Sequence, residues 1–517
     1  MSHVSRRTFL SQASALAGVA AISDTRTLAQ SQTSTPFAHR TATELAGLIR
    51  TKEISAEELT RYFIGRIERF DREINAVVAR DFERAMDAAR SADAALGRSV
   101  EVGPLHGVPM TIKESYDLAG LPTTWGFPRF ADNIASVDAD VVTRFKQAGA
   151  HFLGKTNVPI ALGDYQSYND IYGTTSNPWD LTRTPGGSSG GSAAALAAGL
   201  CALESGSDIG GSIRNPAHYC GVYGHKPTWG IVSRRGQALP GRVSQTDLAV
   251  VGPMARCAED LSLAMGIVTG PDALDAPGWR LELPPPRARR LSDLRVAVWP
   301  THELSPPSNE ISGRIQQLAD MLGRLGATVS DSVRPDFSPS HHHATYTKLL
   351  GSVTGANVGD EQFAQARRLA GQFDRSDDSW PAISAQAAVL HHRDWLESNN
   401  ERTHIRLAWR RFFSNWDLVL CPIMATTAFP HDQRARAERT LAVDGVAAPA
   451  FGQSFWAGLA TLGYLPSTVF PTGPSTDGLP IGLQAIGPAY HDNTTIEFAR
   501  LMADEIGGFT PPPGYGD

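Results

Sequence analysis

The sequence predicts an α/β fold in which helices cover the faces of a β-sheet. Helix-like and strand-like segments alternate along most of the 517 residues. Hydrophobic residues make up 42% of the chain and charged residues 19%, so a large core can form. The length fits about three domains or a single large α/β domain. No internal repeat is found.

Residues 40–97 are predicted to be helical. Thr41 with Glu44, and Ser55 with Glu58, each fit a capping box, in which two side chains satisfy the free N–H groups at a helix start. Apolar residues follow at helical spacing from position 59 onward.

The remaining elements are predicted from the same periodicities. Segment 105–113 alternates as a strand does, with Val108, Met110 and Ile112 on one face. Helices are expected at 140–149, about 192–200, 309–326 and over most of 340–412, and strands at 151–153, 202–204, 294–299, 417–421 and 481–486.

The first 29 residues have the character of an export signal. Residues 5–10 read SRRTFL, a twin-arginine pattern, and a short apolar stretch of small residues follows at 13–22. That stretch is far shorter than the roughly 20 residues of a membrane-spanning helix, and no other run is long enough. We therefore expect export to the periplasm or secretion, with cleavage after residue 29 and no membrane insertion of the mature chain.

Charge and cysteine content exclude several classes of protein. The net charge is −6, from 47 Lys and Arg against 53 Asp and Glu, which argues against a nucleic-acid binder. The four cysteines have no CxxC spacing, so a disulfide scaffold and a cysteine zinc site are not expected. Histidines at 341–343 and 391–392 lack carboxylates at ligand spacing, so no metal site is predicted.

Two motif matches are rejected on physical grounds. Residues 149–156 spell a phosphate-binding P-loop, but their middle is apolar and Pro159 interrupts the helix that should follow. Residues 186–190 spell the nucleophile elbow of Ser-His-Asp hydrolases, but a loop precedes them instead of a strand. A Ser-His-Asp hydrolase remains an alternative.

A third segment, DIGGSIR at 208–214, follows a strand-like stretch. Its glycines allow backbone N–H groups to converge on one point, which suits a developing oxyanion. The alternative is a tight turn with a capping serine.

Taken together, these segments resemble the amidase signature family. That family includes fatty acid amide hydrolases, peptide amidases, malonamidases and the amidotransferase subunits that charge glutaminyl-tRNA. The matching motifs are GVP at 107–109 with Lys113, GKTN at 154–157, NPWD at 177–180, GGSSGGS at 186–192, DIGGSIR at 208–214, KPT at 226–228 and GLPIGLQ at 478–484. Ile231 is a departure, since family members often carry arginine there.

The resemblance implies one domain over 30–517 with a central mixed, twisted sheet covered on both faces by helices. Its catalytic core is expected at about 105–235 and a helical insertion at about 340–412.

The resemblance also implies a Ser-cisSer-Lys triad. Ser212 corresponds to the nucleophile, Ser188 to the bridging serine after a cis peptide bond, and Lys113 to the base. A lysine acts as a base only when neutral, so burial must lower its pKa.

Further residues have supporting roles in this expectation. The N–H groups of Ile209, Gly210 and Gly211 are expected to form the oxyanion hole. Ser189 is expected beside the relay, and Asp208 and Arg214 are expected to fix the loop through an ion pair. No metal or cofactor is required.

Three aromatic residues, Trp125, Phe127 and Tyr165, are candidates for the wall of an acyl pocket. The alternative is that they belong to the core, where buried aromatic side chains are usually found.

The first functional hypothesis is an exported hydrolase of small or linear amides, with esterase or carbamate side activity. The second is a glutamine-dependent amidotransferase subunit that works on tRNA in a complex, against which the signal and the acidic charge argue. The third is an inactive binding protein, against which the intact Lys113, Ser188 and Ser212 argue. The sequence does not identify the substrate or the oligomeric state, and a homo-oligomer is one of the states that it allows.

Overall fold

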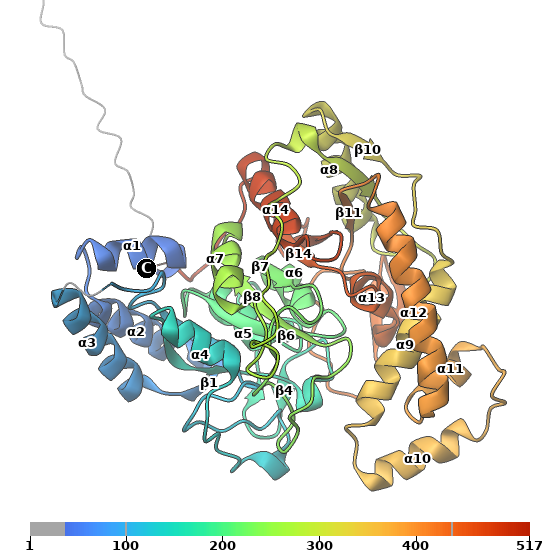
Figure 1. The fold of residues 1–517 in the computed structure, drawn as a ribbon, viewed down its shortest axis with the longest axis horizontal. Coiled ribbons are helices and arrows are strands. Elements are labelled where there is room, and N and C mark those ends of the chain that lie inside the picture. Colours follow the sequence, from blue (N-terminus) through green and yellow to red (C-terminus); the bar gives the residue numbers. More distant parts are fainter. Residues whose placement is uncertain (1–36, 99–100, 436–437, 517) are drawn as a thin grey trace, which may run out of the picture. The chain divides into compact units, whose positions relative to one another are not determined.

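A large mixed β-sheet organises the computed structural model, which describes residues 37–98, 101–435 and 438–516 (Figure 1). The predicted signal, residues 1–29, lies outside these ranges. In spatial order the eight strands are β10 (Thr328–Ser330), β9 (Arg295–Val298), β11 (Leu418–Cys421), β15 (Pro480–Ile486), β14 (Ser467–Pro474), β7 (Tyr223–Lys226), β8 (Val250–Ala255) and β6 (Glu204–Asp208).

A three-stranded sheet extends this arrangement beyond β6. Its order is β1 (Val77–Arg80), β3 (His151–Thr156) and β2 (Pro109–Lys113), with β2 parallel to β3 and β1 antiparallel to it. The N–H of Thr111 donates to the carbonyl of Leu203, so β2 lies beside the start of β6. This neighbour relation brings the end of β2 to the functional site.

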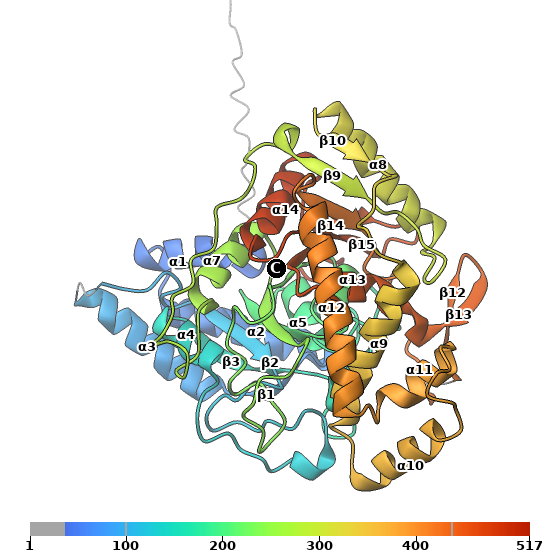
Figure 2. The ribbon, with the colours of Figure 1, turned by 45° about the vertical axis from the view of Figure 1, so that its right-hand side comes forward.

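Helices pack against both faces of the sheet (Figures 1 and 2). The helices of the described residues are α1 (Ala42–Arg50), α2 (Ala56–Ile74), α3 (Phe82–Gly97), α4 (Asp140–Gln147), α5 (Gly190–Ala197), α6 (Arg214–Cys220), α7 (Ala258–Val268), α8 (Asn309–Arg324), α9 (Pro339–Gly355), α10 (Asp360–Ala370), α11 (Trp380–Ala387), α12 (His392–Phe412), α13 (Ser454–Leu462) and α14 (Asp492–Ile506).

Successive residues of β7 show which helices lie on which face, because side chains alternate along a strand. His225 Nε2 lies 3.1 Å from Asp492 Oδ1 of α14. The preceding residue, Gly224, faces α6, where an added Cβ would lie 2.9 Å from the Cβ of Ala217. Helices α14 and α6 therefore cover opposite faces, which confirms the predicted α/β architecture.

The predicted capping boxes are both present. Thr41 Oγ1 accepts the N–H of Glu44 and the Glu44 carboxylate accepts the N–H of Thr41; Ser55 and Glu58 pair in the same way. These contacts fix the starts of α1 and α2.

Several predicted elements need correction. Strand β1 interrupts the helical region 40–97, residues 105–108 form a turn before β2, and β6 begins two residues later than expected. Strands β7, β8 and β14 were not predicted. Each contains glycine, and β8 and β14 also contain proline. All three are nearly fully buried, so their patterns lack the alternation of a half-exposed strand.

The region 340–412 consists of helices α9 to α12, of which α9, α11 and α12 lie side by side (Figure 2). A short hairpin, β12 (Thr440–Val443) and β13 (Val446–Pro449), follows, and a second small pair is β4 (Tyr168–Asn169) with β5 (Gly173–Thr174). Among the described residues, no helix is long and apolar enough to cross a membrane.

Candidate active site

Lys113 occupies the last position of β2, a strand whose five residues are all buried. Its amine lies within hydrogen-bonding distance of three serine hydroxyls: Ser188 Oγ at 2.7 Å, Ser189 Oγ at 2.8 Å and Ser207 Oγ at 2.9 Å. The first two serines precede α5 and the third lies on β6. The amine therefore joins three segments of the chain.

Burial is the main influence on this amine. Removal from water lowers the pKa of Lys113 well below its ordinary value, because a buried charge loses its hydration. Asp208, Glu204 and Glu114 oppose this shift and Arg234 adds to it, and the net direction is downward. Lys113 thus meets the physical requirement for a neutral lysine that can accept a proton.

The loop before α5 is held in one conformation. The Gly187–Ser188 peptide bond is cis, the N–H of Gly187 donates to Asn215 Oδ1 at 3.0 Å, and the N–H of Gly190 donates to Ser167 Oγ at 3.1 Å. Gly187 has no room for a side chain, since an added Cβ would lie 2.3 Å from the carbonyl oxygen of Asp164. These contacts fix Ser188 against Lys113.

Ser189 lies beside the same amine. Its Oγ accepts from Lys113, and its N–H donates to the carbonyl of Ser212 at 3.1 Å, which ties the two serine loops together. Its side chain does not cap α5. Ser207 was not anticipated as a third partner of the amine, and no sequence signal marks it.

Asp208 organises the loop that carries Ser212. Its carboxylate accepts the N–H groups of Gly211 at 2.9 Å and Ile213 at 3.1 Å, and it forms a fully buried ion pair with Arg214 at 2.9 Å. Arg214 also donates to the Ala457 carbonyl and to Gln484 Oε1. The pair therefore joins the loop backbone to α13 and to β15.

The surroundings of the Asp208 carboxyl favour its ionised form. Burial alone would raise the pKa of the Asp208 carboxyl, but the Arg214 guanidinium, Lys226 and the Gly211 N–H outweigh it and bring the pKa to about 2. The Asp208 side chain is therefore ionised at neutral pH.

Hydrogen bonds also orient the peptides between Asp208 and Ser212. Tyr346 donates its hydroxyl to the Ile209 carbonyl at 2.9 Å and Tyr165 donates to the Gly210 carbonyl at 3.1 Å. The expectation that the Gly211 N–H is free for an oxyanion needs correction, because Asp208 already accepts it. Among the described residues, the N–H groups of Ile209, Gly210 and Ser212 have no acceptor.

Ser188 and Ser212 line one cavity of about 340 Å³, together with Ser207, Ile209 and Gly210. Of the three aromatic candidates for its wall, Trp125 and Tyr165 line it, whereas Phe127 does not. Other walls come from the 239–249 segment, from α9 and from α11.

The charged side chains at this cavity already have partners. Asp164 pairs with Arg439 at 2.6 Å, and Arg234 donates to Gln237 Oε1 at 2.6 Å. Exposed Arg242 donates to the Ala356 carbonyl at 2.6 Å. The cavity is otherwise lined largely by apolar side chains: Trp125, Leu162, Leu239, Ala249, Leu350 and Val353.

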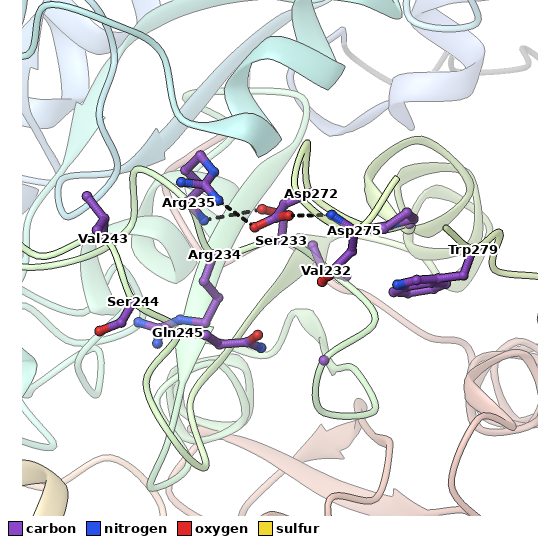
Figure 3. Close-up of a pocket in the computed structure, with 13 residues that line it drawn as sticks. Val232, Ser233, Arg234, Arg235, Val243, Ser244, Gln245, Asp272, Asp275 and Trp279 are labelled. Atoms are coloured by element: carbon purple, nitrogen blue, oxygen red, sulfur yellow. Dashed lines mark hydrogen bonds and ion pairs between the residues drawn. The ribbon is translucent and has the colours of Figure 1, made fainter. Parts of the chain in front are cut away.

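A second, much smaller pocket of about 40 Å³ lies on another side of Arg234 (Figure 3). Arg235 there pairs with Asp272 at 2.7 Å, and Asp272 also accepts the N–H of Asp275. None of the serines around Lys113 lines it. Among the described residues, no group of three or more His, Cys, Asp and Glu side chains is arranged to hold a metal ion.

Comparison with known proteins identifies the family. The Amidase family profile matches residues 58–496. The chain belongs to the amidase signature family. It is accordingly an enzyme of the class that hydrolyses carbon–nitrogen amide bonds.

Two curated relatives and one solved structure illustrate the range of this family. The chain is 32% identical to the A subunit of glutamyl-tRNA(Gln) amidotransferase from Moorella thermoacetica, over 89% of this chain and 95% of the relative. It is 32% identical to indoleacetamide hydrolase of Bradyrhizobium diazoefficiens, over 90% and 86%. A bacterial aryl acylamidase structure superposes with a TM-score of 0.76 at 26% identity, over 91% of this chain and 97% of that chain.

Substitution Asp208→Asn is expected to lower the free energy of unfolding by about 3–5 kcal/mol at pH 7, because Arg214 is left buried without its carboxylate. The folded pKa of Asp208 lies below the ordinary value of about 3.9, so its contribution is complete above pH 4 and declines as the pH falls toward 2. The difference in the free energy of unfolding between wild type and variant should therefore become smaller at acid pH.

Urea unfolding at pH 7 and pH 3 measures this difference. Asp180→Asn is the matched control, because Asp180 pairs with Arg183 at the surface and should change stability little. An equal effect of both substitutions would contradict the role given to Asp208.

Proposed function

We propose that this protein hydrolyses amides through an acyl-enzyme on Ser212, with Ser188 as the bridging serine and Lys113 as the base. One observation carries the proposal: the fully buried amine of Lys113 lies 2.7 Å from Ser188 Oγ, at a cavity that Ser212 also lines. Burial of the amine supplies a base, and the cavity gives the serines access to a substrate.

The proposed relay moves two protons. Neutral Lys113 accepts the proton of Ser188 while Ser188 accepts that of Ser212, and Ser212 Oγ attacks the amide carbonyl. As the tetrahedral intermediate collapses, the C–N bond breaks and the proton returns through Ser188 to the leaving amine. Water then attacks the acyl-enzyme, with the relay as base, and releases the acid.

The oxyanion donors in this proposal are the N–H groups of Ile209, Gly210 and Ser212. Gly211 acts differently from the first expectation, since its N–H holds the loop onto Asp208. A donor aimed before the reaction begins stabilises the developing charge without reorganisation.

The cavity favours an acyl group that is largely apolar and carries no positive charge. Its carboxylates, Asp164 and Asp208, are already ion-paired, so a substrate cation would have to displace Arg439 from Asp164 or stay unpaired. A cavity of about 340 Å³ fits a ligand the size of an arylacetamide or a medium-length alkyl amide. Esters and carbamates of the same acyl size suit the same chemistry.

A second candidate function is that of an amidotransferase subunit, because several of the curated relatives are A subunits of glutamyl-tRNA(Gln) amidotransferases. Such a protein would take its ammonia from glutamine, which carries both an ammonium and a carboxylate group. The pairing of Asp164 with Arg439 argues against recognition of the ammonium group here.

The purified chain alone is expected to release ammonia from phenylacetamide, indoleacetamide and hexanamide, with kcat/KM at least about 100-fold higher than for glutamine, because the cavity leaves the ammonium group of glutamine unpaired. Ser212→Ala should lower the rate at least about a thousandfold, whereas Ser332→Ala, at an exposed position, should not change it. A strict requirement for partner proteins, or a preference for glutamine, would favour the amidotransferase alternative.

The rate should also depend on pH through Lys113. Because the base must be neutral and burial lowers its pKa, kcat/KM should be constant at alkaline pH and fall as the pH drops below that lowered value. Lys113→Met should abolish turnover, whereas Lys52→Met at the surface should leave both rate and profile unchanged.

The pH dependence of the free energy of unfolding provides an independent measure of the ionisation of Lys113. The unfolded chain binds a proton at Lys113 between the lowered folded pKa and about 10.4, so this group makes stability rise with pH across that window. Lys113→Met should remove that rise of stability with pH in thermal unfolding, whatever the stability that the variant loses with the three serine contacts. Turnover that survives in Lys113→Met would contradict the mechanism.

We further propose that residues 1–29 direct export, on the strength of the SRRTFL pattern at 5–10 and the apolar stretch after it. In a bacterium with twin-arginine translocation, replacement of Arg6 and Arg7 by lysine should leave the uncleaved precursor in the cytoplasmic fraction. Arg26→Lys should still be exported and cleaved. Export that is unaffected by the Arg6 and Arg7 changes would disprove the signal.

A further inference from the structure

Tyr346 reaches the oxyanion loop from the helical region 340–412. It lies on α9, its side chain is fully buried, and its hydroxyl donates to the Ile209 carbonyl at 2.9 Å. Burial raises the pKa of this phenol well above its ordinary value, so the hydroxyl stays protonated and acts as a donor at any working pH. Tyr346 is not among the residues that line the cavity.

The contact fixes the direction of one particular N–H group. A trans peptide is planar, with its C=O and N–H pointing in opposite directions. Tyr346 holds the carbonyl of the Ile209–Gly210 peptide, so the N–H of Gly210 must point to the other side. That N–H is one of the three that have no acceptor among the described residues.

The next peptide, Gly210–Gly211, is held at both its carbonyl and its N–H. Its Gly210 carbonyl accepts from Tyr165, and its Gly211 N–H donates to Asp208. The Ile209–Gly210 peptide has only the Tyr346 hydroxyl among the described residues. Glycine at 210 places little steric limit on rotation of this peptide, so loss of that hydroxyl would release it.

The position of α9 explains why this helix carries such a residue. Thr347, Leu350 and Val353 of the same helix line the cavity, so one rigid element holds both the acyl wall and the peptide that faces the substrate carbonyl. The Tyr346 ring is itself fixed from α13, where an added Cβ on Gly458 would lie 2.7 Å from the ring carbon Cδ1.

We propose that Tyr346 is a positioning residue for catalysis: its hydroxyl aims the Gly210 N–H at the oxyanion of the transition state. This inference rests on the proposed function, since it assumes a tetrahedral intermediate on Ser212. It assigns to α9 a role in the chemical step that is separate from substrate binding.

Substitution Tyr346→Phe removes only the hydroxyl. Loss of a complete oxyanion donor costs about 10²–10³ in kcat, and a donor that is present but no longer aimed should cost about 10–100-fold. KM for the best amide should change less than about twofold, because Tyr346 does not line the cavity and the binding of the ground state is retained. Tyr223→Phe is the matched control, a buried tyrosine on β7 outside the site.

Inhibitors separate this role from a general loss of structure. A boronic acid with the acyl chain of the best substrate forms a tetrahedral adduct on a serine and so places an oxygen where the oxyanion would lie. The alcohol with the same chain forms no such adduct. The Ki of the boronic acid should rise in Tyr346→Phe by about the factor by which kcat falls, and the Ki of the alcohol should not change. Gly458→Ala, which displaces the ring and keeps the hydroxyl, should give the same pattern.

Two results would overturn the inference in a protein whose wild type is active: an unchanged kcat in Tyr346→Phe, or an equal weakening of both inhibitors in both variants. If the wild type itself turns over no amide and binds no boronic acid, the proposed function fails instead, so the two failures are distinguishable.

Discussion

The site depends on one buried amine. Lys113 is fully buried and contacts three serine hydroxyls, so its proton affinity is set by the protein interior and not by solvent. The contact also imposes a geometric condition, since the end of β2, the end of β6 and the loop before α5 must meet at one point. The neighbouring placement of β2 and β6 follows from the same condition.

A second buried group fixes the loop that carries Ser212. Asp208 holds the backbone of that loop and Arg214 together, and Arg214 extends the contact to α13 and to Gln484 on β15. The residues of the proposed relay and the ion pair beside it lie between 113 and 214, but their placement requires segments near the C-terminus. This is consistent with a family match that extends from residue 58 to 496.

The proposed catalytic residues and much of the cavity wall lie in different parts of the chain. The serines, the lysine and the glycine turn lie in segments with strong motifs, whereas much of the cavity wall comes from the 239–249 segment and from α9 and α11. Walls of this kind have no fixed chemical requirement beyond shape and polarity, so they differ among proteins that share the same reaction.

Local features could be predicted from the residues alone: the capping boxes at Thr41 and Ser55, the helices of 340–412, and the motif segments that contain Lys113, Ser188 and Ser212. Helix caps and periodicity act over a few residues, so they can be recognised without the fold. Other features of the site appear only in the folded chain. Three contacts depend on packing that a linear pattern does not reveal. Ser207 is a third partner of the amine, Asp208 accepts the Gly211 N–H, and Tyr346 donates to a carbonyl 137 residues away.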